Sequence, residues 1–486
     1  MVRKTGVFWL LLWFLVARQQ AFSALQAGET QGGSGVSARA PSIILILADD
    51  LGYGELGCYG QRLIQTPQLD RMAAEGLRFT RFYSGATVCA PSRSVLMTGQ
   101  HHGHTRVRGN AGPGNPSAQA LQADDLTVAR LLQSAGYRTA LFGKWGLGDV
   151  GPAESGLPRR QGFDQFYGYL NQVHAHNHFP AFLWENEQRV ALRNVVTAVG
   201  DAGGGYASQA VDFADDLFAA KSLQFVRENR DRPFFLYWSL VTPHANNERT
   251  RALKNGAHVP DFGPYADRDW SEQDRGHAAM ITRLDAHVGR LLDELKTLGI
   301  AEQTLVLFSS DNGPHNESGH NPDRFQPSGP FSGMKRSLKD GGIRVPCLAW
   351  WPATIAAGTV SERAAYLGDV LATAAELSAC PAPPNTDSLS LVPVLRGQAE
   401  RAGRHEFLYW EFHEGGFRSA CLYQGRWKAL RRLGAAVQLF DTEQDPAESV
   451  DVAAQYPEIT AIVTDYLNTA RTDSANWPAR GPSTTP

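Results

Sequence analysis

Residues 41–54 read P-S-I-I-L-I-L-A-D-D-L-G-Y-G, and this stretch indicates the fold class. The apolar run at 43–47 shows no polar alternation, which is typical of a central strand covered on both faces. It ends abruptly in Asp49 and Asp50. Two carboxylates at the end of a buried strand repel each other unless a cation lies between them, and ligand sites of open α/β sheets lie at that edge. The stretch predicts a hard metal site with oxygen ligands, with a helix N-cap, which needs only one aspartate, as the alternative.

A second apolar run repeats this arrangement far along the chain. Residues 304–310 read T-L-V-L-F-S-S and precede Asp311 and Asn312. Two such strands would deliver four oxygen side chains to one edge of a sheet. A Ca²⁺-type site is therefore the favoured interpretation of both aspartate-bearing segments.

The remaining pattern predicts an α/β protein with a small C-terminal addition. Beyond Arg404, short apolar runs separated by turns predict an antiparallel sheet, followed by a helix at 456–469. Further strands are expected at 137–142, 233–240 and 347–351, and helices at 126–135, 209–229, 267–298 and 367–377.

Residues 89–99 read C-A-P-S-R-S-V-L-M-T-G and predict a thiol at the start of a helix. Pro91 suits the first helical turn, because its missing N–H would be unpaired there. A helix N-terminus offers free amide donors, and the Arg93 guanidinium matches a tetrahedral oxyanion. Cys89 would therefore face an anion site, with a buried structural cysteine as the alternative.

Three cationic or titratable side chains follow predicted strands or glycine-rich turns. Lys144 lies in G-K-W-G-L-G at a strand end, where backbone can approach a ligand closely. His244 follows a buried strand and a proline, a position suited to acid–base chemistry. Lys335 precedes the turn K-D-G-G-I-R. The alternatives are a solvated surface lysine for Lys144 and a hydrogen-bonded loop histidine for His244.

These segments, in this order, resemble the sulfatase family over about residues 41–470. The family shows C-x-P-S-R followed by T-G, the D-D and D-N metal pairs, G-K-W, P-H and a second G-K, and this chain matches all except that its second lysine follows Met334. The resemblance implies an alkaline-phosphatase-like sandwich with a large mixed sheet between helices, plus a small C-terminal antiparallel sheet with a helix. It also implies hydrolysis of sulfate monoesters, on a sulfated carbohydrate or small molecule, with aryl sulfates as assay substrates.

The resemblance carries a set of roles onto individual residues. Cys89 is oxidised by a maturation enzyme to formylglycine, whose hydrated aldehyde attacks sulfur and later expels sulfate by elimination. The catalytic residues are Cys89, Arg93, Lys144, His244 and Lys335. One Ca²⁺ per chain is bound by Asp49, Asp50, Cys89, Asp311 and Asn312.

The chain departs from the family pattern at Gly146, where the family has a histidine assigned to sulfate expulsion. Asp340 also replaces a usual glutamate. Residues 171–178 read N-Q-V-H-A-H-N-H, and the alternating histidines would share one face of a strand. We expect His174 and His176 to line the substrate pocket, and either could supply the base missing at Gly146.

The N-terminus predicts export. Arg3 and Lys4 precede an apolar core at 7–17 and small residues at 21–23, the pattern of a signal peptide. The core is too short to span a bilayer and no second run is long enough, so stable membrane insertion is not expected. The expected location is periplasmic or extracellular, or lysosomal or secretory in a eukaryote. A net charge of −3 argues against nucleic-acid binding.

The predicted organisation has five parts. They are a signal peptide (1–23), a disordered leader (24–39), a sulfatase catalytic domain (40–385), a C-terminal α+β subdomain (386–475) and a flexible tail (476–486). With five cysteines, at least one stays unpaired; Cys89 is the candidate, and the others could form up to two disulfides.

Two rival functions remain open. A phosphatase or phosphodiesterase of the same superfamily would use serine or threonine and two zinc ions, which the C-A-P-S-R segment speaks against. An inactive binding protein of sulfatase fold is favoured only by Gly146.

Overall fold

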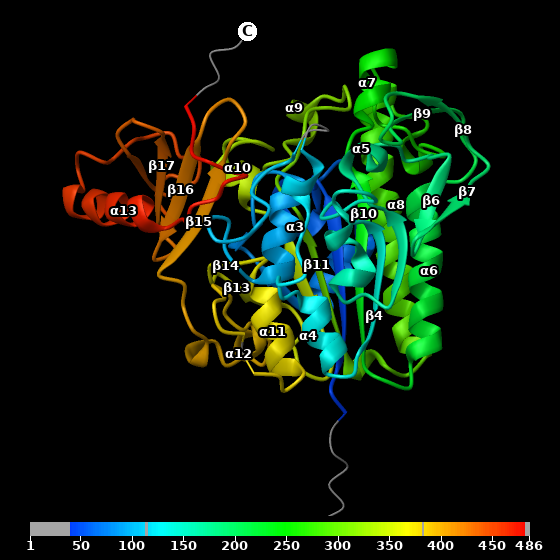
Figure 1. Ribbon diagram of the computed structural model, residues 1–486, viewed down its shortest axis with the longest axis horizontal. Helices are drawn as coiled ribbons and strands as arrows, with labels where there is room; N and C mark the ends of the chain where they lie inside the picture. The colour runs from blue at the N-terminus through cyan, green and yellow to red at the C-terminus, as the bar shows by residue number, and fades with distance from the viewer. Residues whose placement is uncertain (1–38, 112–114, 382, 482–486) are drawn as a thin grey trace, which may run out of the picture. The chain divides into compact units, whose positions relative to one another are not determined.

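A ten-stranded mixed sheet forms the centre of the computed structural model, which describes residues 39–111, 115–381 and 383–481 (Figure 1). Its strand order is β13-β2-β12-β11-β1-β10-β4-β5-β6-β7. The five strands from β11 to β5 in this order run parallel, and antiparallel pairings flank them. The strands are β1 (Ser42–Asp49), β2 (Leu77–Phe79), β4 (Arg138–Lys144), β5 (Gln165–Tyr169), β6 (Phe182–Glu185), β7 (Gln188–Ala191), β10 (Phe234–Pro243), β11 (Thr304–Ser310), β12 (Cys347–Trp350) and β13 (Thr359–Ser361).

The central strand β1 is covered on both faces, as its apolar run predicts. Ile43 pairs with Phe235 of β10 on one side and Leu305 of β11 on the other. Alternate side chains enter two separate cores: Ile43 and Leu45 lie in one, and Ile44 and Ile46 in the other. All four side chains are buried.

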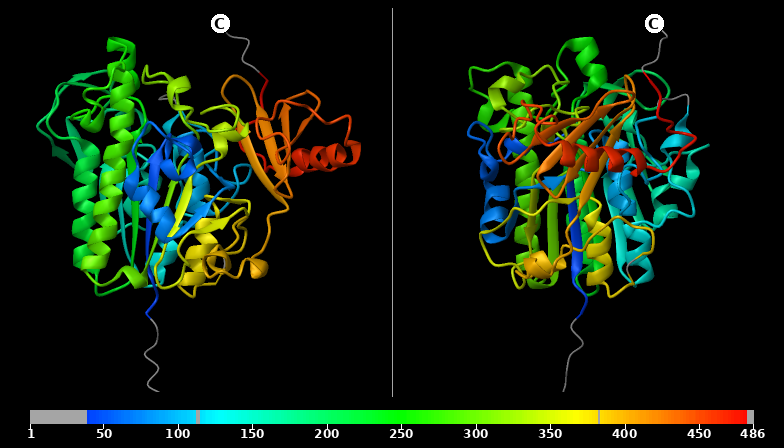
Figure 2. Two further views of the ribbon diagram at one scale, coloured as in Figure 1. Left: turned by 180° about the vertical axis from the view of Figure 1, so that it is seen from behind. Right: turned by 90° about the vertical axis from the view of Figure 1, so that its left-hand side faces the viewer.

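Helices cover each face of the sheet. One core contains α3 (Cys89–Thr98), α4 (Val128–Ser134) and α11 (Asp369–Leu377), which lie in front of the sheet in Figure 1. The other contains α2 (Pro67–Glu75), α6 (Ala214–Asn229) and α8 (Glu272–Thr297), seen from behind in Figure 2. The expected sandwich of a large mixed sheet between helices is confirmed. The shorter helices are α5 (Gln172–Ala175), α7 (Asn247–Leu253), α9 (Pro322–Phe325), α10 (Asp340–Ile343) and α12 (Val392–Leu395).

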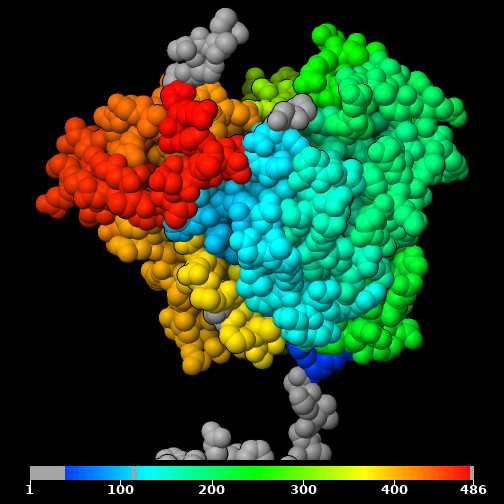
Figure 3. Space-filling view, in the orientation of Figure 1, coloured from blue at the N-terminus to red at the C-terminus, as the bar shows by residue number. Residues whose placement is uncertain are grey.

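The expected small C-terminal sheet with a helix is also confirmed. Its four antiparallel strands are β15 (Phe407–Phe412), β16 (Arg418–Tyr423), β17 (Trp427–Arg432) and β18 (Gln438–Asp441), and α13 (Pro457–Thr469) packs on them. The segment after α13 returns to the large part of the molecule, where Thr472 accepts hydrogen bonds from Arg108 (Figure 3). Two further two-stranded sheets pair β3 (Phe82–Tyr83) with β14 (Ala365–Tyr366) and β8 (Val195–Ala198) with β9 (Gly205–Gln209).

Two expectations need correction. The histidine-rich segment forms the short helix α5, not a strand, because the Asn171 side chain accepts a hydrogen bond from the His174 amide and caps a helical turn. The alternation therefore does not place the three histidines on one face. All five cysteines lie in the described residues and none forms a disulfide.

The signal peptide and residues 24–38 of the leader lie outside the described residues, as does the tail from residue 482. Within the described ranges, no helix is long and apolar enough to cross a bilayer. Residues 391–395 pack in the same core as α11. The domain boundaries remain predictions.

Candidate active site

Four parallel strands end at one edge of the large sheet and place most of the predicted residues there. β1 ends at Asp49, β4 at Lys144, β10 at Pro243 and β11 at Ser310. The backbone of Asp50 adopts a left-handed φ of 64°, which turns the chain sharply as it leaves β1. Carboxylates, a lysine and a histidine from distant parts of the chain therefore converge at the strand ends, as the sheet topology predicts.

Cys89 is the first residue of α3 and lies against the two aspartates. Its thiol is buried, and Sγ lies 3.4 Å from Asp49 Oδ1 and 3.9 Å from Asp50 Oδ1. Burial, followed by the charge of Asp49, raises the pKa of the Cys89 thiol well above its ordinary value. An unmodified Cys89 would therefore stay a neutral thiol and be a weak nucleophile.

Arg93, one turn further along α3, ties this helix to β11. Its Nε and Nη2 donate to Asp311 Oδ2 at 3.0 and 2.8 Å. Its Nη1 donates to the Lys144 carbonyl at 2.8 Å and to the Ser239 hydroxyl. The guanidinium is fully buried, so its position is fixed by these partners on β4, on β10 and directly after β11.

Two buried lysines each face one aspartate of the Asp49–Asp50 pair. Lys144 Nζ lies 2.6 Å from Asp49 Oδ2, and Lys335 Nζ lies 2.8 Å from Asp50 Oδ2. Burial alone would raise the pKa of each carboxyl group. Together the surrounding positive charges, Lys144 foremost, outweigh burial and hold the pKa of Asp49 well below its usual range. At Asp50 the charge and hydrogen bond of Lys335, with smaller contributions from other neighbours, outweigh burial and lower the pKa to about 2.

His244 lies beside Lys335 in a defined tautomer. Its Nδ1 lies 2.7 Å from the Ala245 carbonyl, which can only accept, so Nδ1 carries the proton. The unprotonated Nε2 accepts a hydrogen bond from Lys335 Nζ at 3.0 Å. Burial, and next the charge of Lys335, lower the pKa of His244 well below its ordinary value. The pair is a charged donor joined to a neutral imidazole.

The oxygen side chains at the edge fit a hard cation. Asn312 Nδ2 donates to Asp50 Oδ1 at 2.6 Å, but its Oδ1 is buried without a hydrogen-bond partner. Burial and the charge of Asp49 raise the pKa of Asp311 to about 7. Crowded carboxylates and an unpartnered amide oxygen are the donors that Ca²⁺ prefers. Asp49, Asp50 and Cys89 also lie in a group close enough to share one ion.

Gln172 occupies the space beside Gly146. The glycine has a φ of +80°, and a Cβ there would lie 2.2 Å from Gln172 Nε2. Both polar atoms of the Gln172 side chain are buried and lack a hydrogen-bond partner. A histidine at position 146 would therefore have to move the end of the Gln172 side chain and adopt a left-handed backbone conformation.

The structure brings His176 to the site but not His174. The His176 ring stacks on His244 with centroids 5.1 Å apart, and its Nδ1 lies 3.1 Å from Glu248 Oε2. His174 packs against Tyr169 and Phe182 instead, and burial lowers its pKa to about 4. The substrate-binding roles of both histidines remain predictions.

Two site residues were not predicted from the sequence. Glu317 Oε2 lies 3.2 Å from Lys335 Nζ, and His315 Nε2 donates to the Pro243 carbonyl at 2.9 Å. Both follow the predicted metal ligands Asp311 and Asn312 within D-N-G-P-H-N-E, so their proximity to Asp311 was the available signal.

Comparison with known proteins decides the family. The sulfatase family model matches residues 41–378, which include the whole edge of the sheet described above. The chain belongs to the sulfatase family. A second model, for the C-terminal part of N-sulphoglucosamine sulphohydrolase, matches residues 332–473. The resemblance to the sulfatase family that the sequence showed is therefore confirmed.

Curated relatives support the same assignment for this sulfatase. Human arylsulfatase A is 36% identical over 434 residues, covering 84% of this chain and 78% of that protein. Mouse steryl-sulfatase is 33% identical over 440 residues, covering 77% and 68%. Human N-acetylgalactosamine-6-sulfatase is 32% identical over 385 residues, covering 75% and 67%. The enzyme is a sulfuric ester hydrolase.

Solved structures share its fold. A protein of Bacteroides thetaiotaomicron, from a locus for the metabolism of multiple glycosaminoglycans, has a TM-score of 0.72 and 26% identity, covering 90% of this chain and 100% of that one. The complex of Ps i-CgsB with k-i-k-neocarrahexaose has a TM-score of 0.74 and 24% identity, covering 92% and 96%. The alkaline-phosphatase-like architecture expected from the sequence is thus confirmed.

Proposed function

We propose that this sulfatase hydrolyses sulfate monoesters of a sulfated carbohydrate, using a formylglycine made from Cys89 and one bound Ca²⁺. The observation that carries the proposal is the position of Cys89. Residue 89 starts a helix and its side chain faces two carboxylates, and three buried cations (Arg93, Lys144 and Lys335) pair with the carboxylates around it.

Formylglycine and Ca²⁺ would both act at this edge of the sheet. Formylglycine at position 89 would supply a hydrated aldehyde as the nucleophile toward sulfur, which the neutral thiol cannot provide. Ca²⁺ would be held by Asp49, Asp50, Asp311, Asn312 and residue 89, and would supply positive charge for the nucleophile and the sulfate oxygens.

The cations of the chain itself bind and orient the sulfate. Arg93, Lys144 and Lys335 have fixed partners, so they need little reorganisation when a sulfate ester enters. Because expulsion of the alcohol moves negative charge onto the leaving oxygen, a proton must reach that oxygen. Lys335 holds a proton on Nζ, and the neutral Nε2 of His244 can share it.

His176 is the better placed of the two predicted pocket histidines. Its Nδ1 donates to the buried carboxylate of Glu248, which leaves Nε2 as the basic nitrogen. The parallel stack on His244 keeps this imidazole beside the proton-transfer pair. We assign His176 to substrate binding. We also assign it the proton-acceptor role of the family's usual histidine, which Gly146 replaces in this chain.

The relatives favour a carbohydrate substrate. N-acetylgalactosamine-6-sulfatase is named for a sulfated sugar, and the similar bacterial structure comes from a glycosaminoglycan locus. The partners implied are a sulfated glycan or small molecule and a formylglycine-generating enzyme. The proposed location is periplasmic or extracellular, or lysosomal or secretory in a eukaryote, because the N-terminal signal would direct the enzyme to export.

The test is a paired assay on the matured enzyme with 4-nitrophenyl sulfate and 4-nitrophenyl phosphate. We expect sulfate hydrolysis to exceed phosphate hydrolysis, and Cys89→Ser to lower sulfate turnover by about 10³-fold or more, because a hydroxyl cannot release sulfate by elimination. Cys380→Ser, at a partly buried cysteine outside the site, serves as the control. Preferred phosphate hydrolysis, or full activity in Cys89→Ser, would refute the proposal.

A further inference from the structure

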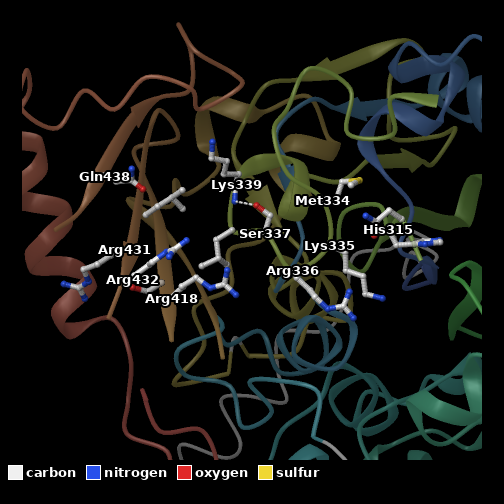
Figure 4. Close-up of a pocket in the computed structure, with 14 residues that line it drawn as sticks. His315, Met334, Lys335, Arg336, Ser337, Lys339, Arg418, Arg431, Arg432 and Gln438 are labelled. Carbon is white, nitrogen blue, oxygen red and sulfur yellow. Dashed lines mark hydrogen bonds between the residues drawn. The ribbon is translucent and has the colours of Figure 1, made fainter. Parts of the chain in front are cut away.

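A basic cleft of about 450 Å³ leads away from the active site (Figure 4). Lys335 and His315 line one end, and residues of the C-terminal strands β16 and β17 line the other. Apart from Lys335, the cationic side chains that line the cleft are Arg336, Lys339, Arg418, Arg431 and Arg432. The catalytic lysine and the C-terminal sheet thus share one cavity.

Three of these cations already have partners. Arg336 forms ion pairs with Glu317 and Glu414. Lys339 donates to the Glu448 carbonyl, and Arg431 donates to Asn468 and to the Leu467 carbonyl. Their positions are explained by contacts within the protein. They make the cleft positive without requiring a ligand.

Arg418 and Arg432 differ from these three in facing each other and in leaving hydrogen-bond donors unused. They lie directly opposite each other on β16 and β17, a like-charge cross-strand pair that is unfavourable by itself. Arg418 Nη2 donates to the Glu414 carbonyl and its guanidinium lies over the Phe412 ring, 4.8 Å from the centroid, but its Nε is buried without a hydrogen-bond partner. Arg432 makes no side-chain hydrogen bond or ion pair with any described residue. Burial, and next the charge of Arg432, lower the pKa of Arg418. No carboxylate forms an ion pair with either guanidinium among the described residues.

We propose that Arg418 and Arg432 bind a second anionic group of the substrate, so that the natural substrate is a polyanionic glycan with a further sulfate or carboxylate beyond the ester that is hydrolysed. The proposal rests on the proposed function, because it places the hydrolysed ester at Lys335. An anion between the two guanidiniums relieves their repulsion and pairs with the buried Nε. The glycan then lies along the cleft from Lys335 to the C-terminal sheet.

The test uses a heparin tetrasaccharide as a competitive inhibitor of 4-nitrophenyl sulfate hydrolysis. In Arg418→Gln/Arg432→Gln we expect the inhibition constant to rise at least about tenfold more than the KM of the aryl sulfate, because only the tetrasaccharide reaches both ends of the cleft. Arg418→Lys/Arg432→Lys, which keeps both charges, should recover most of the affinity.

The matched control is Arg232→Gln/Arg396→Gln, at two exposed arginines outside the cleft whose side chains form no hydrogen bond or ion pair with any described residue. It should change neither constant. Carboxyl-reduced and selectively desulfated tetrasaccharides identify which anionic group the arginines bind. An equal change of the inhibition constant in Arg418→Gln/Arg432→Gln and in the control Arg232→Gln/Arg396→Gln would overturn the inference.

The failures of the two proposals are distinguishable. If the wild-type enzyme hydrolyses 4-nitrophenyl sulfate but the cleft variant binds the tetrasaccharide normally, only the cleft proposal fails. If the matured wild type does not hydrolyse the aryl sulfate, the proposed function fails. Calorimetric titration of the tetrasaccharide into the wild type and the cleft variant then still tests whether the two arginines bind the glycan. Equal affinities of the two proteins would refute that role.

Discussion

Two clusters of buried charge in this enzyme differ in their balance. The edge cluster, at the strand ends, contains four carboxylates against three permanent cations, and it leaves Asn312 Oδ1 without a partner. The junction cluster, where α10 meets the C-terminal sheet, balances two carboxylates with two cations. The edge cluster consists of Asp49, Asp50, Asp311, Glu317, Arg93, Lys144 and Lys335, and the junction cluster of Asp340, Glu448, Arg344 and Lys428.

The difference in charge balance suits the two clusters to different roles: the junction cluster joins two parts of the molecule, and the edge cluster is suited to bind ligands. Lys428 Nζ lies 2.8 Å from Asp340 Oδ1, and Tyr83 and Arg344 bind the other oxygen of that carboxylate. These contacts fasten a strand of the small sheet to the large part of the molecule. The edge cluster is similarly buried, but its carboxylate and amide oxygens outnumber the cations that could pair with them. A bound metal cation would balance these oxygens, and an anionic substrate could then bind beside it.

Removal of one lysine from each cluster should have the largest effect, on activity in one case and on stability in the other. Lys335→Met should lower kcat for 4-nitrophenyl sulfate by about 10²–10⁴-fold, because it removes the proton donor beside His244. Lys428→Met should lower the free energy of unfolding by about 3–5 kcal/mol, because it leaves Asp340 buried without its lysine. Kinetics and denaturant unfolding of both variants measure the two effects. A Lys428→Met enzyme with native stability and lost kcat would contradict the distinction.

Metal binding should act on the edge cluster. Ca²⁺ at 100 times its dissociation constant should raise the stability of the chelator-treated protein by about 2.7 kcal/mol. Asn312→Leu should lose most of this gain, because it removes the unpartnered amide oxygen. Asn468→Leu, at an exposed position on α13, is the control and should keep it. Thermal unfolding with and without Ca²⁺ provides the measurement, and an equal gain in both variants would argue against the assigned ligands.

The two pocket histidines provide a smaller test. His176→Gln should lower kcat by about 10²-fold, because it removes the imidazole held between Glu248 and His244. His174→Gln should have a much weaker effect, since its ring packs against Tyr169 and Phe182. Steady-state kinetics of the two variants decide between them. A greater loss in His174→Gln would reverse the assignment.

The junction cluster should show its own pH dependence. Burial raises the pKa of Glu448 from 4.5 to about 7, so the folded state binds a proton more tightly than the unfolded state. Its contribution to stability therefore falls by about 1 kcal/mol per pH unit as pH rises through this window. Glu448→Gln should remove this part of the pH dependence of the free energy of unfolding, as measured by denaturant unfolding at a series of pH values. An unchanged slope would contradict the assignment.

Sequence reasoning predicted the edge cluster because its cause is local. Apolar runs that end in acidic residues define strand ends, and parallel strands bring those ends together. The same logic could not place Glu248 beside His176, which are 72 residues apart, or the Gln172 side chain in the space beside Gly146. It also expected a strand where the Asn171 cap makes a helix. These contacts depend on tertiary packing that periodicity does not report.

The Arg418–Arg432 pair was missed for a related reason. Each arginine alone has the pattern of an exposed strand residue. Only the register of β16 against β17 reveals that the two charges face each other.

The most direct test of the central claim is a mass spectrum of the tryptic peptide 82–93 from enzyme isolated from its native host. We expect Cys89 to be present as the aldehyde in active enzyme. An unmodified thiol in enzyme that still hydrolyses sulfate esters would contradict it.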